Sequence, residues 1–277
     1  MIGDLHCHST LSDGSSSLED LVLYAKNAGL DYIALTDHDT LAGNAQAVAL
    51  GKRCGVGVIP GVEFSAVDSQ RGGRKVHILC YFPRNTQPLE KICRRTLSSR
   101  TQAGEEMIRR VMEQYPVTAE NIARYTSASQ SIYKSHIMLA LMDLGYTDRV
   151  YSDLFHKLFG SDGSCFVPTE YAEVREVVSA IRDAGGLSVM AHPFQYGGSY
   201  QLLEELAQTK MIDGVELHHP RAKQKDMELS KEIAERYNLI CTGGTDFHGA
   251  CTSSPNPIGT YITSQENRAR IIAHSQA

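Results

Sequence analysis

The sequence DLHCHSTLSDG, residues 4–14, ends the first predicted β-strand with two histidines that stand one residue apart, and an aspartate follows in the loop. Alternate residues of a strand point to the same side, so His6 and His8 can face one metal ion. A helical pattern comes next: Ser16 and Glu19 have the spacing of a capping box, and apolar residues then recur with helical spacing. The chain therefore opens with a β-α unit whose strand ends in metal-binding residue types.

The alternation of strands and helices continues on both sides of a long helical region. Strands are predicted at 31–36, 56–64, 75–82, 187–192, 213–218 and 239–246, and helices at 44–54, 173–184, 200–209 and 223–237. Residues 88–164 lack strand signals and carry helical patterns throughout. We therefore expect an α/β fold in which about seven strands form a parallel sheet or a (β/α) barrel from residues 1–87 and 165–277, with residues 88–164 as an inserted helical subdomain.

The composition is that of a globular protein and excludes several classes. The 277 residues are 42% hydrophobic and carry a net charge of -5, which argues against an extended nucleic-acid surface but not against a small phosphorylated substrate. The seven cysteines are scattered without a Cys-x-x-Cys pair, so they are expected to be reduced thiols. Neither a secretory leader nor an apolar stretch long enough to span a membrane is present, and we expect a cytoplasmic location.

Polar side chains gather at the carboxyl ends of the predicted strands. In chain order they are His6, His8, Asp37, His38, Asp39, Glu63, His192, Asp246 and His248. In a barrel of parallel strands these ends converge on one rim, where active sites form. His77 is the exception, because it lies early in the predicted strand 75–82, and a bulge or a different strand limit would be needed to bring it to the rim.

Each of these motifs alone has a structural explanation, since a His-x-His can be two partly buried imidazoles and Thr-Asp-His-Asp can be a helix start. The whole set is harder to explain in that way, because so many charges gathered without a cation would repel one another and lose their hydration. Imidazole and carboxylate together are ligands of Mn, Fe and Zn, and a carboxylate such as Glu63 can bridge two ions. The sequence therefore predicts a multinuclear metal site.

Six segments, DLHCHSTLSDG, ALTDHD, PGVEFS, VHILCY, MAHP and GTDFH, resemble in this order the motifs of the PHP (polymerase and histidinol phosphatase) family of metal-dependent phosphoesterases. The resemblance spans nearly the whole chain and implies a distorted (β/α)7, TIM-like barrel with two or three divalent ions. On the family pattern the first ion is held by His6, His8, Glu63 and Asp246, the second by Glu63, His77 and His192, and the third by Asp13, His38 and His248.

The helical region, with KSHIMLALMDLGY, is similar to the branch of this family that releases phosphate from nucleoside 3′,5′-bisphosphates or degrades short RNA. The resemblance implies a phosphoric ester hydrolase in which a metal-bridging water is the nucleophile. The expected reaction is removal of the 3′-phosphate from a nucleoside 3′,5′-bisphosphate. A 5′-3′ exonuclease acting on short RNA and a histidinol-phosphatase-like enzyme are the alternatives.

The expected substrate contacts lie where related sequences often carry Arg-Pro-His and this one has Lys134–Ser135–His136. Lysine keeps the positive charge but lacks the bidentate fork of arginine. Lys134 and His136 are expected to bind either a second phosphate or the charge that develops during the reaction, and the alternative for Lys134 is a solvated surface position. Lys75 and its neighbours in QRGGRK are interpreted as turn residues.

Two other classes of protein remain possible on the sequence. A metal-dependent amidohydrolase builds similar sites on a barrel but commonly uses a lysine at a strand end, and none of these strand ends carries one. A non-catalytic PHP module that serves as a scaffold would be expected to have lost ligands, whereas all nine positions are filled here.

Overall fold

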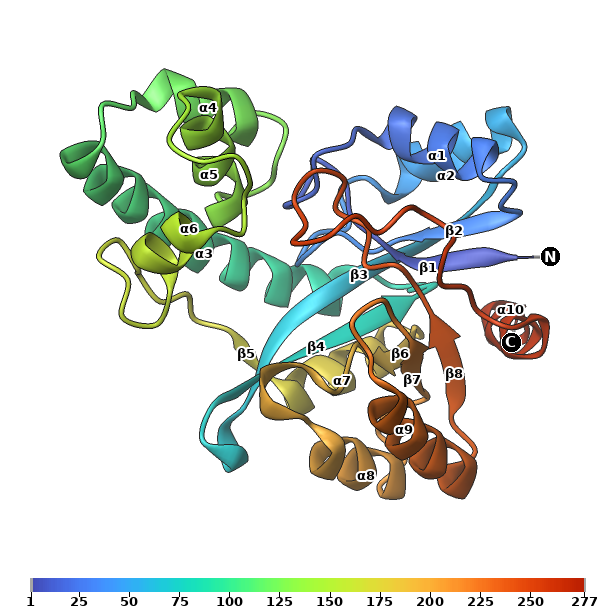
Figure 1. Ribbon diagram of the computed structural model, residues 1–277. Coiled ribbons are helices and arrows are strands. Elements are labelled where there is room, and N and C mark those ends of the chain that lie inside the picture. The colour runs from blue at the N-terminus through green and yellow to red at the C-terminus, as the bar shows by residue number, and fades with distance from the viewer. Residues whose placement is uncertain (1, 277) are drawn as a thin grey trace.

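Seven strands follow one another around a nearly closed barrel (Figure 1). In this computed structural model, which describes residues 2–276, their order is β1 (Gly3–Cys7), β2 (Tyr32–Leu35), β3 (Gly57–Asp68), β4 (Arg74–Tyr81), β6 (Leu187–Met190), β7 (Gly214–His218) and β8 (Ile240–Gly243). The short β5 (Ala172–Glu173) pairs with β3 outside this series. The expected α/β barrel is confirmed.

Helices flank the barrel, and six of them adjoin its strands in sequence. They are α1 (Leu18–Asn27), α2 (Asn44–Cys54), α7 (Val174–Asp183), α8 (Tyr200–Gln208), α9 (Gln224–Tyr237) and α10 (Gln265–Gln276). The capping box expected at Ser16 and Glu19 is wrong by one residue, because Ser17 is the N-cap and its Oγ accepts from the amide of Asp20 at 3.1 Å. Ser16 instead belongs to the loop after β1, where its carbonyl accepts from the amide of Thr10.

Strand β4 runs antiparallel to both of its neighbours, β3 and β6, which the prediction of a parallel sheet missed. The segment between β3 and β4 contains only the 3-10 turn Ser69–Arg71 and two glycines with positive φ. Such a short connection can join antiparallel strands only. Because β4 is reversed, its first half lies at the rim where the other strands end. His77 pairs with Ser65 across this hairpin and reaches the rim without a bulge.

The barrel closes next to this rim through the loop after β8. Cys7 and Phe247 form a parallel bridge, with the amide of His8 donating to the Phe247 carbonyl at 2.9 Å and the amide of Phe247 donating to the His6 carbonyl at 3.1 Å. The first and last strands of the barrel therefore bring their polar ends together.

The helical lobe contains α3 (Gln87–Gln114), α4 (Ala119–Thr126), α5 (Lys134–Asp143) and α6 (Asp153–Phe159), and it stands beside the barrel (Figure 1). The second half of α3 packs with α4, α5 and α6 around a core of their own. The first half of α3 contributes Leu89 and Ile92 to the core of the barrel. Since α3 belongs to both cores, the limits 88 and 164 stay a prediction.

No helix in the described part of the chain is long and apolar enough to cross a membrane.

Candidate metal centre

The structure brings the nine predicted metal ligands together at one rim of the barrel. They come from β1, from the loop after β1, from the loop after β2, from β3, from β4, from the end of β6 and from the loop after β8. These ligands are His6, His8, Asp13, His38, Glu63, His77, His192, Asp246 and His248. Segments separated by up to about 240 positions in the chain therefore supply one site.

Glu63 lies at the centre of this site, and its side chain is buried. Five imidazoles approach its two oxygens. Oε2 lies 3.1–3.2 Å from nitrogens of His6, His8 and His38, and Oε1 lies 2.9 Å from His77 Nδ1 and 3.0 Å from His192 Nε2. A carboxylate that faces ligands on both oxygens is placed to bridge two cations.

Three groups of side chains have ligand atoms within 4.8 Å of one another. They are His6, His8, Glu63 and Asp246; then His38, Glu63 and His77; and then His8, Asp13, His38 and His248. The first group equals the set expected for the first ion. The second contains Glu63 and His77 as expected, but His38 takes the place expected for His192. His192 lies beside Glu63 Oε1, the oxygen that His77 also approaches. The third adds His8 to the expected set.

Five buried atoms at the centre have no hydrogen-bond partner among the described residues. They are His6 Nε2, both ring nitrogens of His8, His38 Nδ1 and Glu63 Oε2. Several lie only 3.1–3.2 Å apart, but without the geometry of a hydrogen bond. A buried polar atom without a partner costs about 1–3 kcal/mol. Cations would satisfy these lone pairs at once, so the residues present fit a metal centre.

The pKa values of Glu63, Asp246 and His8 show that the site favours positive charge. Burial alone would raise the pKa of Glu63 and of Asp246, but nearby imidazoles, His6 foremost, hold both well below their usual range. Burial would lower the pKa of His8, yet the nearby carboxylates of Asp246 and Glu63 raise it to about 10. Both carboxylates are therefore ionised, and protons or metal ions must balance them.

Glu216 of β7 is a further site residue, which the sequence analysis missed. Its Oε1 lies 2.9 Å from His6 Nδ1, and its Oε2 accepts from the amide of His192 at 2.9 Å. A carboxylate on Nδ1 keeps the proton on that nitrogen and leaves Nε2 free as a ligand. The signal in the sequence is a single acidic residue between the apolar Val215 and Leu217 of the strand GVELH.

Asp246 is held from the loop after β7. His219 Nε2 lies 3.3 Å from Asp246 Oδ2, and Arg221 donates to the same oxygen at 2.7 Å. Neither His219 nor Arg221 is among the site residues predicted from the sequence. Both restrict the orientation of the Asp246 carboxylate.

Asp37 and Asp39, which also lie at the end of β2, hold loops and belong to none of the ligand groups. Asp37 accepts from the amide of Ser9 at 2.7 Å and from the hydroxyl of Ser12 at 2.6 Å. Asp39 accepts from the amide of Ser65 at 3.0 Å. These contacts fix the loops that carry the ligands.

Three site residues have backbones in the left-handed region, namely Asp39 (φ 55°), His192 (φ 26°) and Asp246 (φ 50°). Such conformations cost on the order of 1–3 kcal/mol each for residues other than glycine, and they persist where the surrounding structure imposes them. The positive φ at Asp246 lies between β8 and the loop that carries His248, where the chain turns across the rim.

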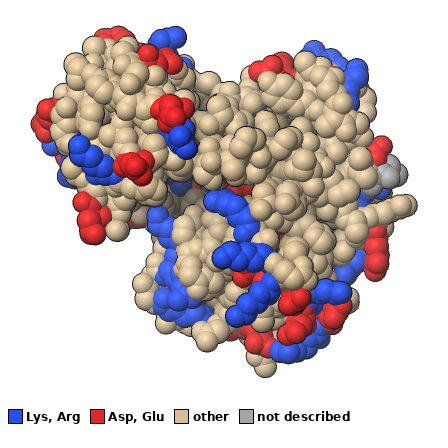
Figure 2. Space-filling model, in the orientation of Figure 1, with Lys and Arg blue, Asp and Glu red and all other residues tan. Residues whose placement is uncertain are grey.

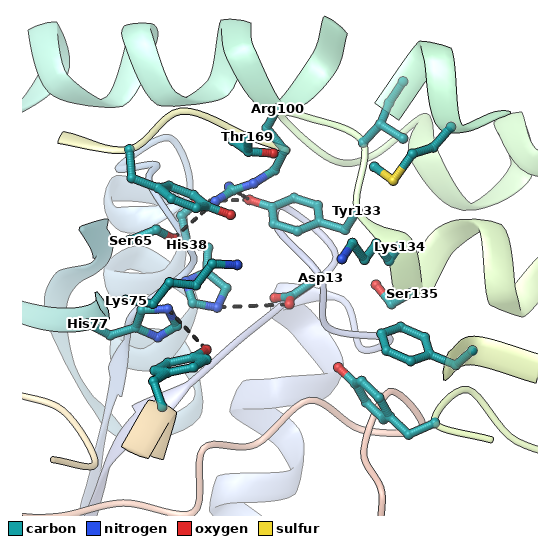
Figure 3. Close-up of a pocket in the computed structure, with 16 residues that line it drawn as sticks. Asp13, His38, Ser65, Lys75, His77, Arg100, Tyr133, Lys134, Ser135 and Thr169 are labelled. Carbon is teal, nitrogen blue, oxygen red and sulfur yellow. Dashed lines mark hydrogen bonds and ion pairs between the residues drawn. The ribbon is translucent and has the colours of Figure 1, made fainter. Parts of the chain in front are cut away.

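A cavity of about 520 Å³ opens over the ligands, between the barrel and the helical lobe. Figure 2 shows the hollow between these two parts of the molecule, with Lys and Arg side chains along its border. A second cavity of about 210 Å³ shares Asp13, His38 and His77 with the first and extends beneath the helical lobe (Figure 3). We call the second one the lysine cavity.

Lys75 and Lys134 line the lysine cavity, and in Figure 3 their amino groups point toward each other above Asp13 and His38. Neither forms an ion pair with a carboxylate of the described chain. Lys134 Nζ donates to the carbonyl of Phe159 at 3.0 Å. Burial, together with the charge of Lys75, lowers the pKa of Lys134 to about 8. Two unpaired cations in one cavity are suited to an anion.

His136 lies behind the wall of this cavity and is not part of its lining. The ring is buried, Nδ1 accepts from the amide of Tyr133 at 3.3 Å, and Nε2 lies 3.1 Å from the carbonyl of Ser12. With both nitrogens engaged inside the protein, the predicted contact of His136 with substrate has no support from its position.

Comparison with known proteins places this arrangement among phosphoesterases. Residues 4–241 match the PHP domain family. The chain is 40% identical over 251 residues to the phosphoribosyl 1,2-cyclic phosphate 1,2-diphosphodiesterase of Eggerthella lenta. This match covers 90% of this chain and 95% of the relative. It is 28% identical over 253 residues to the 3′,5′-nucleoside bisphosphate phosphatase of Chromobacterium violaceum, covering 88% and 86%.

A solved structure described as a metal-dependent phosphoesterase, from Bifidobacterium adolescentis, superimposes with a TM-score of 0.88 at 28% sequence identity. The superposition covers 98% of this chain and 96% of the other, so it includes the helical lobe as well as the barrel.

Proposed function

This chain belongs to the PHP domain family of metal-dependent phosphoesterases, and from that premise we propose that its substrate is a ribose compound carrying two phosphoryl groups. Family membership makes it a phosphoric ester hydrolase, so the amidohydrolase and scaffold alternatives are set aside. The observation that supports the finer proposal is the position of two unpaired lysines in a cavity that shares Asp13, His38 and His77 with the metal centre.

We propose two or three divalent ions, Mn, Fe or Zn, held by the nine ligands in the groups given above. When bound, such ions coordinate phosphate oxygens, lower the pKa of a coordinated water and offset the charge that develops during hydrolysis. The protein contributes orientation: Glu216 keeps His6 in the tautomer with a free Nε2, and His219 and Arg221 hold Asp246.

Lys75 and Lys134 would bind the phosphoryl group that is not hydrolysed. Charge-assisted hydrogen bonds from two ammonium groups fix this anion, and the binding energy holds the ester at the metal centre. Arg221, half exposed on the wall of the larger cavity, keeps donors free beside Asp246 for the reacting phosphate.

The names of two relatives support a ribose with two phosphoryl groups. One names a phosphoribosyl group with a 1,2-cyclic phosphate, and the other a nucleoside with phosphates at 3′ and 5′. The 3′-phosphate of a nucleoside bisphosphate, expected from the sequence, is one member of this class. The higher identity to the Eggerthella lenta enzyme makes the cyclic ester the first compound to test. The cytoplasmic location stays a prediction.

The test compares kcat/KM for phosphoribosyl 1,2-cyclic phosphate, adenosine 3′,5′-bisphosphate and adenosine 5′-monophosphate, with Mn present. Because a charge-assisted contact contributes about 1.5–3 kcal/mol, the compounds with two phosphoryl groups should be preferred by about 10- to 100-fold. Lys75→Ala and Lys134→Ala should remove most of that preference. Lys231→Ala, on an exposed face of α9, is the matched control and should leave it intact.

Equal kcat/KM for mono- and bisphosphorylated compounds, unaffected by the two lysine variants, would refute the second phosphate site. Short RNA and histidinol phosphate belong in the same assay. A higher kcat/KM for either would favour the exonuclease or histidinol-phosphatase-like alternative.

A further inference from the structure

The helical lobe contacts the loop that carries Asp13 at several points. The hydroxyl of Ser129 donates to the Ser12 carbonyl at 2.9 Å and lies 3.3 Å from the Leu11 carbonyl. The amide of Gln130 donates to the Leu11 carbonyl at 2.9 Å. Because His136 Nδ1 accepts from a backbone amide, its Nε2 carries the proton and donates to the Ser12 carbonyl. The backbone before Asp13 is thus fixed by donors of the lobe.

The same lobe contacts the loop that carries His38. The hydroxyl of Tyr133 donates to the His38 carbonyl at 3.0 Å, and Arg100 donates to the Tyr133 oxygen at 2.9 Å. Arg100 also donates to Asp39 Oδ2 at 2.7 Å and to the Ser65 hydroxyl at 3.0 Å. Arg100 and Tyr133 are both buried, so these hydrogen bonds have little competition from water.

His6, His192 and Asp246 are held from the barrel. Glu216 of β7 contacts His6 and the backbone of His192, and residues after β7 contact Asp246. Asp13 and His38 share one ligand group, the third, with His8 and His248. His38 also belongs to the second group, so the third group is the one in which the lobe holds the loops of two ligands. The contacts that hold His6 and Asp246 of the first group come from the barrel.

We propose that the helical lobe positions the third cation, with Arg100, Tyr133, Ser129 and His136 as positioning residues for Asp13 and His38. The proposal rests on the metal centre of the proposed function. Its physical reason is that a ligand loop held by external hydrogen bonds loses less conformational freedom on binding an ion. Arg100, although it lines the lysine cavity, acts here through Asp39 and Tyr133.

The test measures bound Mn per chain by equilibrium dialysis and elemental analysis at graded free Mn. Tyr133→Phe keeps the ring and removes the donor to His38, and Ser129→Ala removes a donor to the Asp13 loop. In each variant the free Mn needed to half-fill the third position should rise about 10-fold, since changes outside the ligand shell cost about 10- to 100-fold in affinity. The ion held by His6, His8, Glu63 and Asp246 should bind as in the wild type.

Tyr200→Phe is the matched control, because it removes a partly buried hydroxyl contact that joins α8 to Asp226 of α9 and involves no predicted metal ligand. It should leave all three affinities unchanged. Circular dichroism verifies that each variant is folded.

Unchanged affinity for all three ions in both Tyr133→Phe and Ser129→Ala would overturn the proposal. Equal weakening of all three would overturn it too, because the lobe would then support the whole centre. A wild-type protein that binds only two ions would also overturn it, yet phosphate release by that two-ion protein would leave the proposed function intact.

Discussion

At the scale of single residues, Glu63 is the point where the ligand groups meet. One of its oxygens faces three imidazoles and the other faces two more, all at 2.9–3.2 Å. Its negative charge is what allows the surrounding imidazoles to share cations, because a neutral side chain of the same shape would leave the ions less well balanced. Removing that charge alone is therefore the most informative single change.

Glu63→Gln should weaken metal binding by at least about 100-fold, since changes outside the ligand shell already cost 10- to 100-fold. Phosphate release should fall together with bound metal, while the far-ultraviolet circular dichroism of the barrel stays unchanged. Glu235→Gln on the exposed face of α9 is the control. Retention of both metal and activity by Glu63→Gln would contradict the bridging role.

If Lys134 binds the second phosphate as proposed, that binding should depend on pH. Its pKa is lowered to about 8 by burial and by Lys75, so its positive charge is complete near pH 6.5 and is lost as the pH rises through 8. The ratio of kcat/KM for a bisphosphate to that for a monophosphate should therefore fall between pH 7 and 9. Lys134→Arg, whose charge persists, should keep the ratio flat. A ratio without pH dependence in the wild type would count against Lys134 as an anion ligand.

Local sequence patterns were sufficient to predict which side chains meet at the rim but not which residues support them. His6, His8 and Asp13 lie in one short motif, whereas Glu216 meets His6 only because β7 and β1 approach in the barrel. Lys75 had a usable signal, because it stands two residues before His77 on one strand and so shares its side. His136 is of a residue type suited to phosphate, but its Nε2 lies 3.1 Å from the Ser12 carbonyl, and its contact with substrate stays a prediction.

At the scale of elements, the reversed strand β4 is what the sequence could not show. Apolar alternation identifies a strand but not its direction, and the short QRGGR turn was the only sign of a hairpin. The reversal puts Lys75 and His77 on the rim, so one element supplies both a metal ligand and a candidate phosphate ligand. For the helical lobe, the sequence pattern predicted the helices. It could not predict their packing on the ligand loops, because that packing depends on contacts between residues far apart in the sequence.

The core of the helical lobe should be necessary for the lobe's stability. Leu141 of α5 is fully buried in that core, and Leu141→Ala should lower the free energy of unfolding by about 2–5 kcal/mol. Leu144, which is 40% exposed at the end of the same helix, provides the control, and Leu144→Ala should change it by less than about 0.5 kcal/mol. Urea unfolding followed by circular dichroism measures both. Equal effects of the two substitutions would mean that the lobe is not packed as described.

At the scale of the whole molecule, the candidate metal centre lies where the first and last strands of the barrel meet the helical lobe. Its ligands lie between residues 6 and 248, and the lobe fixes two of the loops that carry them. Lys134 comes from the lobe and Lys75 from the barrel, so the lysine cavity exists only when both parts are in place. The proposed metal site and the proposed second phosphate site therefore depend on one relative arrangement of lobe and barrel.

The most direct test of this central claim is anomalous X-ray diffraction from crystals of the protein loaded with Mn. Ions should produce peaks beside Glu63, within about 2.0–2.3 Å of nitrogen and oxygen atoms of the nine ligands. One peak is expected among His6, His8, Glu63 and Asp246, and further peaks beside His77 and beside Asp13. Peaks that lie only elsewhere on the molecule, or a rim without any Mn peak in fully active crystals, would contradict the assignment of this rim as the metal centre.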